Sequence, residues 1–372
     1  MIYFDNAATT YPKPQCVYDA MDIAMKQYAF NAGRGSYQSS RNTFDMIEET
    51  RQKIASLIDE SGNKVVFTSS ATESFNNILY GLNLSSNDSV FVSPFEHNAV
   101  IRTLHNLGVK IVIIPFKKDT WELSEEELND LYVIKKPKAT IISHISNVTG
   151  YELPYKKIFD IAKRYNSITV LDCAQSYGIY SIEKTNADFL IFAGHKSLYA
   201  MFGVAGYINI SGWDLSTYKV GGTGSDSLNP NMPNDSPAKY EAGSPNSISI
   251  FSVNSSIEYL KTEDFAKKED NLVKYLLDGL SKIPQVHIYL PAGYISRGIV
   301  SFNVEGFSSD EIGAILSEDY DICVRTGYHC APFIHDIIDS KSFNGTVRVS
   351  LGIFNTISEL DKLIHAIKEI LL

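Results

Sequence analysis

Residues 168–197 read ITVLDCAQSYGIYSIEKTNADFLIFAGHKS, and this stretch decides the fold class. It contains two short apolar runs, ITVLD and DFLIF, and each is followed by polar residues. Apolar runs of this length are typical of strands that are covered on both faces of a sheet. The stretch therefore predicts two strands of a buried, mostly parallel sheet.

The same pattern continues outward, from about residue 65 to residue 210. Strand-like runs alternate there with segments of helical period, and the seven runs are VVFTSS, SVFVS, KIVIIPF, ATIISHIS, ITVLD, DFLIFAG and VAGYINI. The alternation predicts an α/β fold with a seven-stranded, mostly parallel sheet. Ligands of such folds gather at the carboxyl ends of the strands, so this edge is where we expect a site.

Beyond Pro245 the pattern predicts a smaller α+β domain. We expect a long helical stretch over Ser252 to Leu280, and capping boxes predict helix starts after Ser308 and Thr356. Strands are expected at RGIVSFNV, ICVRTG and GTVRVSLG. The polar segment 220–245, rich in Gly, Pro, Asn and Ser, is predicted to be a linker or a site loop. The predicted domains are residues 15–250 for the large one, and residues 1–14 with 251–372 for the small one.

Composition excludes several classes of protein. The 372 residues are 44% hydrophobic and 20% charged, which is the balance of a globular chain. Lys and Arg number 33 against 43 Asp and Glu, so the net charge is 33 − 43 = −10 and nucleic acid is not an expected partner.

The apolar stretches and cysteines point to an intracellular setting. Stretches such as 110–116 are far shorter than a membrane helix, and the N-terminus, MIYFDNAATTYPKP, lacks the pattern of a secretory signal. We therefore expect no membrane partner and a cytoplasmic location. The cysteines show no CxxC spacing, so no metal site is expected and each is treated as a lone thiol; they are Cys16, Cys173, Cys323 and Cys330.

A phosphate site is one interpretation of Ser69-Ser-Ala-Thr-Glu-Ser74. This segment follows a predicted strand and precedes a helical run, so amides and hydroxyls converge where a helix begins. The alternative is an ordinary Ser/Thr helix cap, which is common in proteins.

Two further residues stand at predicted strand ends. Asp172 ends ITVLD. A carboxylate at a strand end has three common roles: it keeps a pyridine nitrogen protonated, it holds a metal, or it caps the next helix. Gln175 is close enough in sequence to bind the same ligand. Lys196 follows DFLIF, where apolar walls would lower its pKa and free the amine to form a Schiff base. The alternative for Lys196 is a solvated surface lysine.

Together these features are what pyridoxal 5'-phosphate requires: an anion site, an acid for its ring nitrogen and an imine lysine. The chain resembles the cysteine desulfurase family, which also includes selenocysteine lyases, in the class V aminotransferase group of fold-type I pyridoxal-phosphate enzymes. The blocks that carry the resemblance are YFDNAATTYPKP, NAGRGSYQSSR, FTSSATES, SPFEHNAVIRTL, SHISNVTGYELP, VLDCAQSYG, FAGHKSLYAMFGVAGYI, YEAGSPN, VRTGYHCAP and GTVRVSLGIFNT.

The resemblance implies a role for each matching position. Lys196 resembles the lysine that binds the cofactor, His97 the imidazole that stacks on its ring, and Asp172 and Gln175 the partners of the ring nitrogen and phenolic oxygen. The positions that match phosphate contacts are Ala71, Thr72 and His195. Gly243 and Ser244 match residues that reach across a homodimer interface to the partner's cofactor. Those that match the substrate carboxylate site are Asn147, Arg325 and Arg348.

Cys330 carries the implied activity. It lies in a polar, Gly-containing segment, which favours exposure, with His329 and Arg325 as local bases or cations that would favour the thiolate. The resemblance implies conversion of L-cysteine to L-alanine, with a persulfide on Cys330 that is passed to a sulfur-acceptor protein. The alternatives are a selenocysteine lyase acting on L-selenocysteine, another C–S lyase or aminotransferase that does not use Cys330, and a non-enzymatic scaffold.

Two departures from the family pattern bear on this expectation. Ala193 stands where many relatives have a serine, so one hydroxyl for the phosphate is missing. Only the short segment 331–345 separates Cys330 from the strand of Arg348, so we expect limited movement of the thiol, low basal turnover and dependence on an acceptor.

Overall fold

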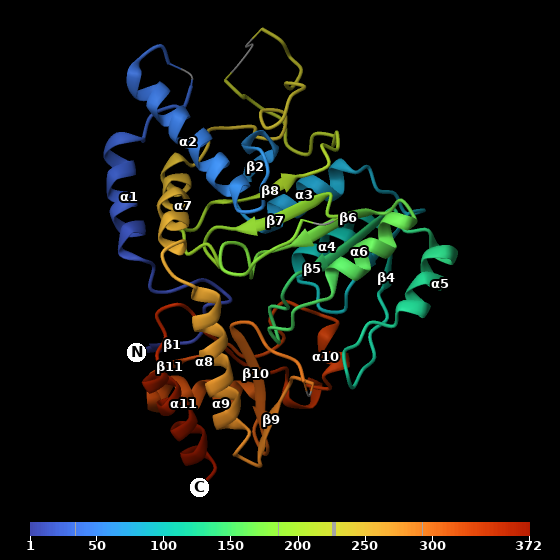
Figure 1. The fold of residues 1–372 in the computed structure, drawn as a ribbon, viewed down its shortest axis with the longest axis vertical. Helices are drawn as coiled ribbons and strands as arrows, with labels where there is room; N and C mark the ends of the chain where they lie inside the picture. Colours follow the sequence, from blue (N-terminus) through green and yellow to red (C-terminus); the bar gives the residue numbers. More distant parts are fainter. Residues whose placement is uncertain (34, 185, 225–227, 292) are drawn as a thin grey trace.

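The computed structural model describes residues 1–33, 35–184, 186–224, 228–291 and 293–372. Figure 1 shows two parts, which we call the large and small lobes. The large lobe, at the top, contains the main sheet, and the small lobe, at the bottom, contains two smaller sheets and both ends of the chain.

The large lobe is built on a seven-stranded sheet with the order β2-β8-β7-β6-β5-β3-β4. Strand β8 is antiparallel to both of its neighbours, and the other pairs are parallel. In chain order the strands are β2 Val65–Thr68, β3 Ser89–Val92, β4 Lys110–Ile113, β5 Ala139–Ser143, β6 Ile168–Asp172, β7 Phe189–Ala193 and β8 Ala205–Asn209. The prediction of a seven-stranded, mostly parallel sheet is confirmed.

Alternating side chains of these strands enter two separate cores. Val170 packs in the core that also contains residues of α3 and α4, whereas its neighbour Leu171 packs in the core formed with α2, α6 and α7. Both faces of the sheet are therefore covered, which is why its strands are apolar runs. The helices of this lobe are α1 Gln15–Gln27, α2 Gln38–Ser56, the 3₁₀ turn η1 Gly62–Lys64, α3 Ala71–Gly81, α4 Asn98–Leu107, α5 Glu125–Lys135, α6 Tyr155–Arg164 and α7 Ser247–Leu260.

The small lobe contains a three-stranded antiparallel sheet, with the order β12-β10-β9, and a parallel pair, β1-β11. Its strands are β1 Ile2–Tyr3, β9 Val286–Ile288, β10 Ile299–Val304, β11 Ile322–Cys323 and β12 Val347–Ser350. Its helices are α8 Phe265–Leu280, α9 Ser309–Tyr320, α10 Ile334–Ile337 and α11 Ile357–Ile370, with the 3₁₀ turn η2 Lys341–Phe343.

The helical stretch predicted over Ser252 to Leu280 is interrupted at residues 261–264. The chain forms two helices there, α7 and α8, because Asp264 starts a new helix by accepting a hydrogen bond from the N–H of Lys267 at 3.0 Å. The capping boxes of Ser308 and Thr356 are both confirmed. The described parts of segment 220–245 contain no helix or strand, and residues 225–227 lie outside the described residues.

Within the described residues, none of the helices combines the length and the apolar character that crossing a bilayer requires.

Candidate active site

A cavity of about 220 Å³ lies at the carboxyl ends of β5, β6 and β7. The last residues of these strands, Ser143, Asp172 and Ala193, all line it. It also brings together most of the residues singled out in the sequence, namely Ala71, Thr72, His97, Asn147, Asp172, Gln175, His195 and Lys196. The site lies at the predicted edge of the sheet.

Lys196 and Asp172 come to this cavity from neighbouring strands. Asp172 ends β6, and Lys196 lies in the turn after β7. Burial lowers the pKa of the Lys196 ammonium, while the carboxylate of Asp172 acts in the opposite direction. Burial raises the pKa of Asp172, although its Oδ1 accepts a hydrogen bond from the N–H of Ala174 at 2.9 Å. The pair is thus a buried acid beside an amine that loses its proton readily, which suits covalent chemistry at the lysine.

His97 lines the cavity as a neutral ring. Its Nδ1 accepts a hydrogen bond from the N–H of Ala99 at 3.0 Å, so the proton of the neutral imidazole is on Nε2. Burial lowers the pKa of His97 to about 3. That value includes the smaller effect of four neighbouring cations, which are Lys196, Arg325, Arg348 and Arg102. A ring that stays neutral and flat suits stacking against an aromatic ligand.

The N-terminus of α3 lies at the cavity and is a candidate anion site. The first amides of a helix have no partner within it, so those of Ala71 and Thr72 are left for a ligand. His195 adds an Nδ1 that is buried and has no hydrogen-bond partner among the described residues. Burial lowers the pKa of His195 to about 3, so its ring is neutral. The Ser70 side chain accepts from the N–H of Glu73 at 3.2 Å, so the Ser/Thr cap is present, and it leaves the amides of Ala71 and Thr72 unused.

Two arginines lie side by side at the adjoining edge. Arg325 and Arg348 form an antiparallel bridge, with reciprocal backbone hydrogen bonds of 3.2 and 2.8 Å. Directly opposed residues of antiparallel strands share a face of the sheet, and like charges in that arrangement are destabilising. The Arg348 guanidinium is buried. Its Nη2 donates to Asp5 Oδ1 at 2.6 Å, and its Nη1 donates to the Asn147 carbonyl at 2.8 Å. Its Nε has no hydrogen-bond partner among the described residues. This charge distribution suits an added carboxylate.

Cys330 is held beside this edge. Its Sγ lies 3.9 Å from a guanidinium nitrogen of Arg325, and its carbonyl accepts a 2.6 Å hydrogen bond from the N–H of Asn98, the residue after His97. The thiol is partly exposed, and Cys330 has a φ of 56°, in the left-handed region. The backbone of Cys330 is thus fixed in an unusual conformation next to the cavity.

The two expected neighbours of Cys330 differ in what they do. Arg325 faces the sulfur, as expected. The expectation for His329 is wrong, because its ring is buried and its Nε2 contacts Thr346 instead, with Thr346 Oγ1 at 2.8 Å. Burial lowers the pKa of His329 well below its usual range, so it supplies no positive charge. Asn147 donates from Nδ2 to the carbonyl of His329 at 2.8 Å and so anchors the cysteine segment.

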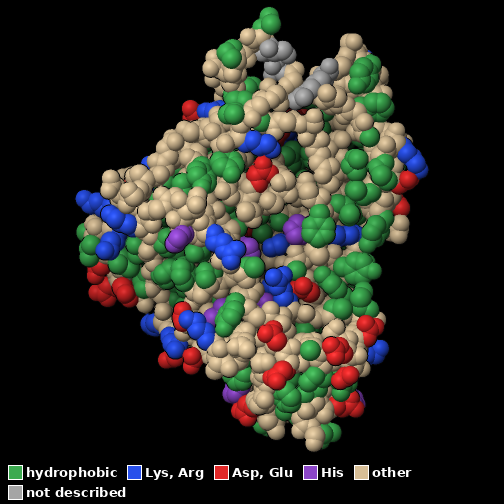
Figure 2. Space-filling model, turned by 180° about the vertical axis from the view of Figure 1, so that it is seen from behind, with side chains coloured by type: hydrophobic (Ala, Val, Ile, Leu, Met, Phe, Trp, Pro, Cys, Tyr) green, Lys and Arg blue, Asp and Glu red, His purple; other side chains and the backbone are tan. Residues whose placement is uncertain are grey.

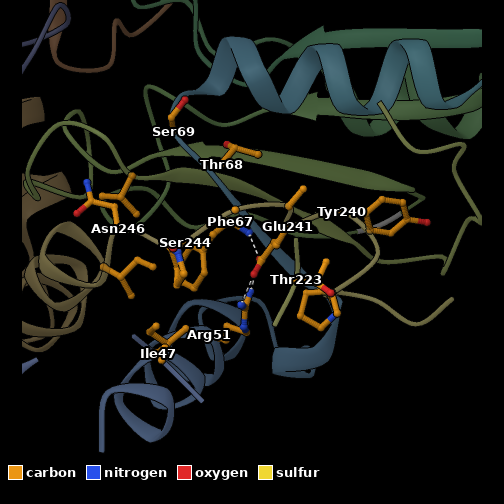
Figure 3. Close-up of a pocket in the computed structure, with 18 of the residues that line it drawn as sticks. Ile47, Arg51, Phe67, Thr68, Ser69, Thr223, Tyr240, Glu241, Ser244 and Asn246 are labelled. Carbon is orange, nitrogen blue, oxygen red and sulfur yellow. Dashed lines mark hydrogen bonds and ion pairs between the residues drawn. The ribbon is translucent and has the colours of Figure 1, made fainter. Parts of the chain in front are cut away.

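Gly243 and Ser244 line a different cavity, of about 440 Å³, which Figure 3 shows. Arg51, from α2, and Glu241 point toward one another there, joined by two hydrogen bonds of 2.6 and 2.5 Å, and Glu241 also accepts from the N–H of Phe67. Gly243 and Ser244 therefore do not reach the Lys196 cavity of their own chain.

Sequence reasoning did not single out three residues at the site. Asp5 pairs with Arg348, and Lys13 donates to the carbonyl of His195 at 3.0 Å. Glu96 is fully buried, and its oxygens accept from the N–H and Oγ of Ser143, each at 2.8 Å. All three lie inside matched blocks, YFDNAATTYPKP and SPFEHNAV, but only the fold shows what they contact.

A family model described as Aminotransferase class-V matches residues 2–363. The chain belongs to the class-V aminotransferase family. A "Probable cysteine desulfurase" of Pyrococcus abyssi is 30% identical to this class-V aminotransferase over 388 residues, covering 100% of the chain and 94% of the relative. A "Cysteine desulfurase" of Haloferax volcanii is also 30% identical, covering 99% of the chain and 88% of the relative.

Solved structures agree with this assignment. The apo structure of cysteine desulfurase from Thermococcus onnurineus superposes with a TM-score of 0.89 at 29% identity, covering 99% of this class-V aminotransferase and 94% of the other chain. A cysteine desulfurase from Escherichia coli, at 24% identity and a TM-score of 0.85, shares the fold. The seven-stranded sheet with its small lobe is thus the fold-type I architecture.

Class-V aminotransferases depend on pyridoxal phosphate, and the residues of this cavity fit that group. The unpartnered Nδ1 of His195 and the start of α3 suit its phosphate, and the acid of Asp172 suits its ring nitrogen. Figure 2 shows Lys, Arg and His side chains gathered in a band between the lobes, on a chain whose net charge is −10. The positive charge of the Lys and Arg side chains in this band attracts anions such as a phosphate and a carboxylate.

Proposed function

We propose that this member of the class-V aminotransferase family is a cysteine desulfurase. It converts L-cysteine to L-alanine and takes the sulfur onto Cys330 as a persulfide, for transfer to an acceptor protein. The observation that carries the proposal is the position of Cys330 beside the cavity that Lys196 lines. Its sulfur lies near the Arg325 guanidinium, and its carbonyl accepts a hydrogen bond from the N–H of Asn98.

Pyridoxal phosphate, when bound, supplies an aldehyde for amino groups and a ring that accepts electrons from the α-carbon. Lys196 would hold that aldehyde covalently, Asp172 would keep a proton on the ring nitrogen, and His97 would stack on the ring. Ala71, Thr72 and His195 would hold the phosphate. Lys196, once released, has the lowered pKa that a base for the α-proton requires.

Substrate recognition falls to the arginine edge. Arg348, with an unpartnered Nε, and the adjacent Arg325 would bind the carboxylate of L-cysteine. The Cys330 thiolate then attacks the substrate sulfur. The sulfur–Cβ bond breaks as the new sulfur–sulfur bond forms, and the carbon skeleton takes the electron pair and is protonated to L-alanine. L-cysteine and the thiol thus give L-alanine and a persulfide with no external oxidant or reductant.

The proposal includes a homodimer. Gly243 and Ser244 line a cavity away from their own Lys196, which is compatible with contacts to the cofactor of a second copy. The bidentate pair of Arg51 and Glu241 fixes the segment that carries them.

Intact-mass analysis after incubation with L-cysteine tests the proposal. We expect the mass of one added sulfur on the peptide with Cys330, and release of L-alanine. Both should be absent in Lys196→Ala, and Cys330→Ser should carry no sulfur. Undiminished sulfide release by Cys330→Ser would instead indicate a lyase that does not use the thiol, and a higher rate on L-selenocysteine would indicate selenocysteine lyase.

A further inference from the structure

Residues 5–13, DNAATTYPK, form a segment that we call the N-terminal strap. It leaves the small lobe after β1 and is held there by two interactions. Asp5 accepts a hydrogen bond from Arg348, and the N–H of Ala7 donates to Ser350 Oγ at 2.9 Å. Its other end contacts the turn of the large lobe that carries Lys196. The strap therefore connects the substrate side of the site with the lysine side.

The turn after β7 is held by its own hydrogen bonds and by contacts from the strap. Within the turn, the N–H of Tyr199 donates to the Lys196 carbonyl and that of Ala200 to the Gly194 carbonyl, each at 2.8 Å. Lys196 lies in neither a helix nor a strand, and its own N–H reaches the Ala193 carbonyl only at 3.4 Å. The strap adds an anchor at the residue before Lys196, because several of its donors lie within hydrogen-bond distance of the carbonyl oxygen of His195. These donors are the Thr10 N–H at 3.0 Å, Thr9 Oγ1 at 3.1 Å, Thr10 Oγ1 at 3.2 Å and Lys13 Nζ at 3.0 Å.

Lys13 is the unexpected member of this group. Its side chain is buried, and Nζ also donates to Thr10 Oγ1 at 2.7 Å. Among the described residues it forms no ion pair, and burial lowers the pKa of its ammonium to about 7. An amine buried without a counter-charge is costly, and a methionine would fill similar space without that cost. Stability therefore does not explain a lysine at this position, whereas its bond to the His195 carbonyl does.

We propose that Lys13 is a positioning residue for Lys196: its amine donates to the His195 carbonyl and fixes the turn that presents Lys196 to the cofactor. The inference rests on the proposed function only in that Lys196 holds the cofactor aldehyde. It does not depend on which amino acid is the substrate.

Lys13→Met, Lys13→Arg and the exposed-loop control Lys118→Met test this inference. The apo-proteins are titrated with pyridoxal phosphate, cofactor bound at Lys196 is trapped with borohydride and mapped, and thermal unfolding of each apo-protein is followed. We expect Lys13→Met to bind the cofactor up to about tenfold more weakly, which corresponds to the loss of one hydrogen bond that holds the turn. Its unfolding temperature should equal or exceed that of the wild type, and Lys13→Arg, which keeps a donor, should recover much of the affinity.

Wild-type affinity and trapping in Lys13→Met would overturn the inference. So would a parallel loss of stability and affinity that Lys13→Arg does not restore, because that is the behaviour of a merely structural residue. If Lys13→Met does not fold, Thr10→Val, which removes the hydroxyl between Lys13 and the turn, is measured in its place, and unchanged affinity then counts against the inference. A wild type that binds cofactor at Lys196 but makes no alanine would contradict the proposed function alone.

Discussion

Arg348 shows at the scale of one residue how the site is prepared for an anion. Its guanidinium is buried, with Asp5 on one nitrogen and a backbone carbonyl on another, and its Nε has no partner among the described residues. A buried donor without a partner costs about 1–3 kcal/mol. A substrate carboxylate would remove that cost when it binds.

Replacing Arg348 by lysine should raise KM for L-cysteine roughly tenfold or more and change kcat less. A lysine is a point charge and cannot hold Asp5, the Asn147 carbonyl and a carboxylate at once. Steady-state alanine formation measures this effect, and Arg164→Lys, in an exposed position, is the matched control. A fall in kcat with KM unchanged would show that Arg348 does not bind the substrate.

His97 should remain neutral between pH 8 and pH 5, because its pKa is lowered to about 3. Its folded pKa is about 3, below the usual 6.5 of the unfolded chain, so its contribution to stability is present above pH 6.5 and lost as the pH falls toward 3. NMR of the ring resonance, assigned with His97→Asn, should show no titration between pH 8 and pH 5. A midpoint near pH 6.5 would contradict the burial and charge described here.

At the scale of elements, ion pairs and helix starts decide where functional segments lie. The pair of Arg51 on α2 and Glu241 fixes the segment with Gly243 and Ser244. The segment 331–345 after Cys330 is likewise organised by α10 and η2, and the cysteine carbonyl is bonded to Asn98. This supports the expectation of limited thiol movement.

Glu241→Gln should destabilise the protein by about 2 kcal/mol, because the buried Arg51 loses one of its two carboxylate partners and keeps only Glu48, at 2.8 Å. Urea unfolding measures the change in the free energy of unfolding. The control is Glu258→Gln, which removes exposed ion pairs and should cost less than about 1 kcal/mol. Equal effects of the two substitutions would show that the Arg51 pair does not hold its segment in place.

At the scale of the whole molecule, a carboxyl group joins the lobes. Glu269, on α8, is buried and accepts hydrogen bonds from Tyr180 at 3.0 Å and Tyr199 at 3.4 Å. Burial raises its pKa from 4.5 to about 8. The lobes are therefore joined best while this acid is protonated.

Glu269→Gln should make stability less sensitive to alkaline pH. A raised folded pKa means that the contribution is complete below pH 4.5 and is lost as the pH rises through about 8, at about 1.4 kcal/mol per pH unit. Urea unfolding between pH 6.5 and pH 8 should show a smaller loss for the variant than for the wild type. Identical slopes would show that Glu269 is already ionised in the fold.

Much of the fold and part of the site follow from local patterns. The apolar runs identify the strands, and in α/β folds Asp172 and Lys196 lie at a common edge because parallel strands end there. The break between α7 and α8 was not predicted, because a single cap at Asp264 outweighs a continuous helical period. The surroundings of His329 were not predicted either, because burial depends on what packs against it.

The sequence by itself determined the sheet, the strand-end residues and the family, since these depend on local composition, period and ordered motifs. Only the tertiary structure decided which charges meet. Asp5 and Arg348 are 343 positions apart, and Lys13 and His195 are 182 apart, yet each pair is in hydrogen-bond contact. Such contacts arise when the lobes pack together, and burial then changes the pKa values of groups whose neighbours in the chain give no sign of it.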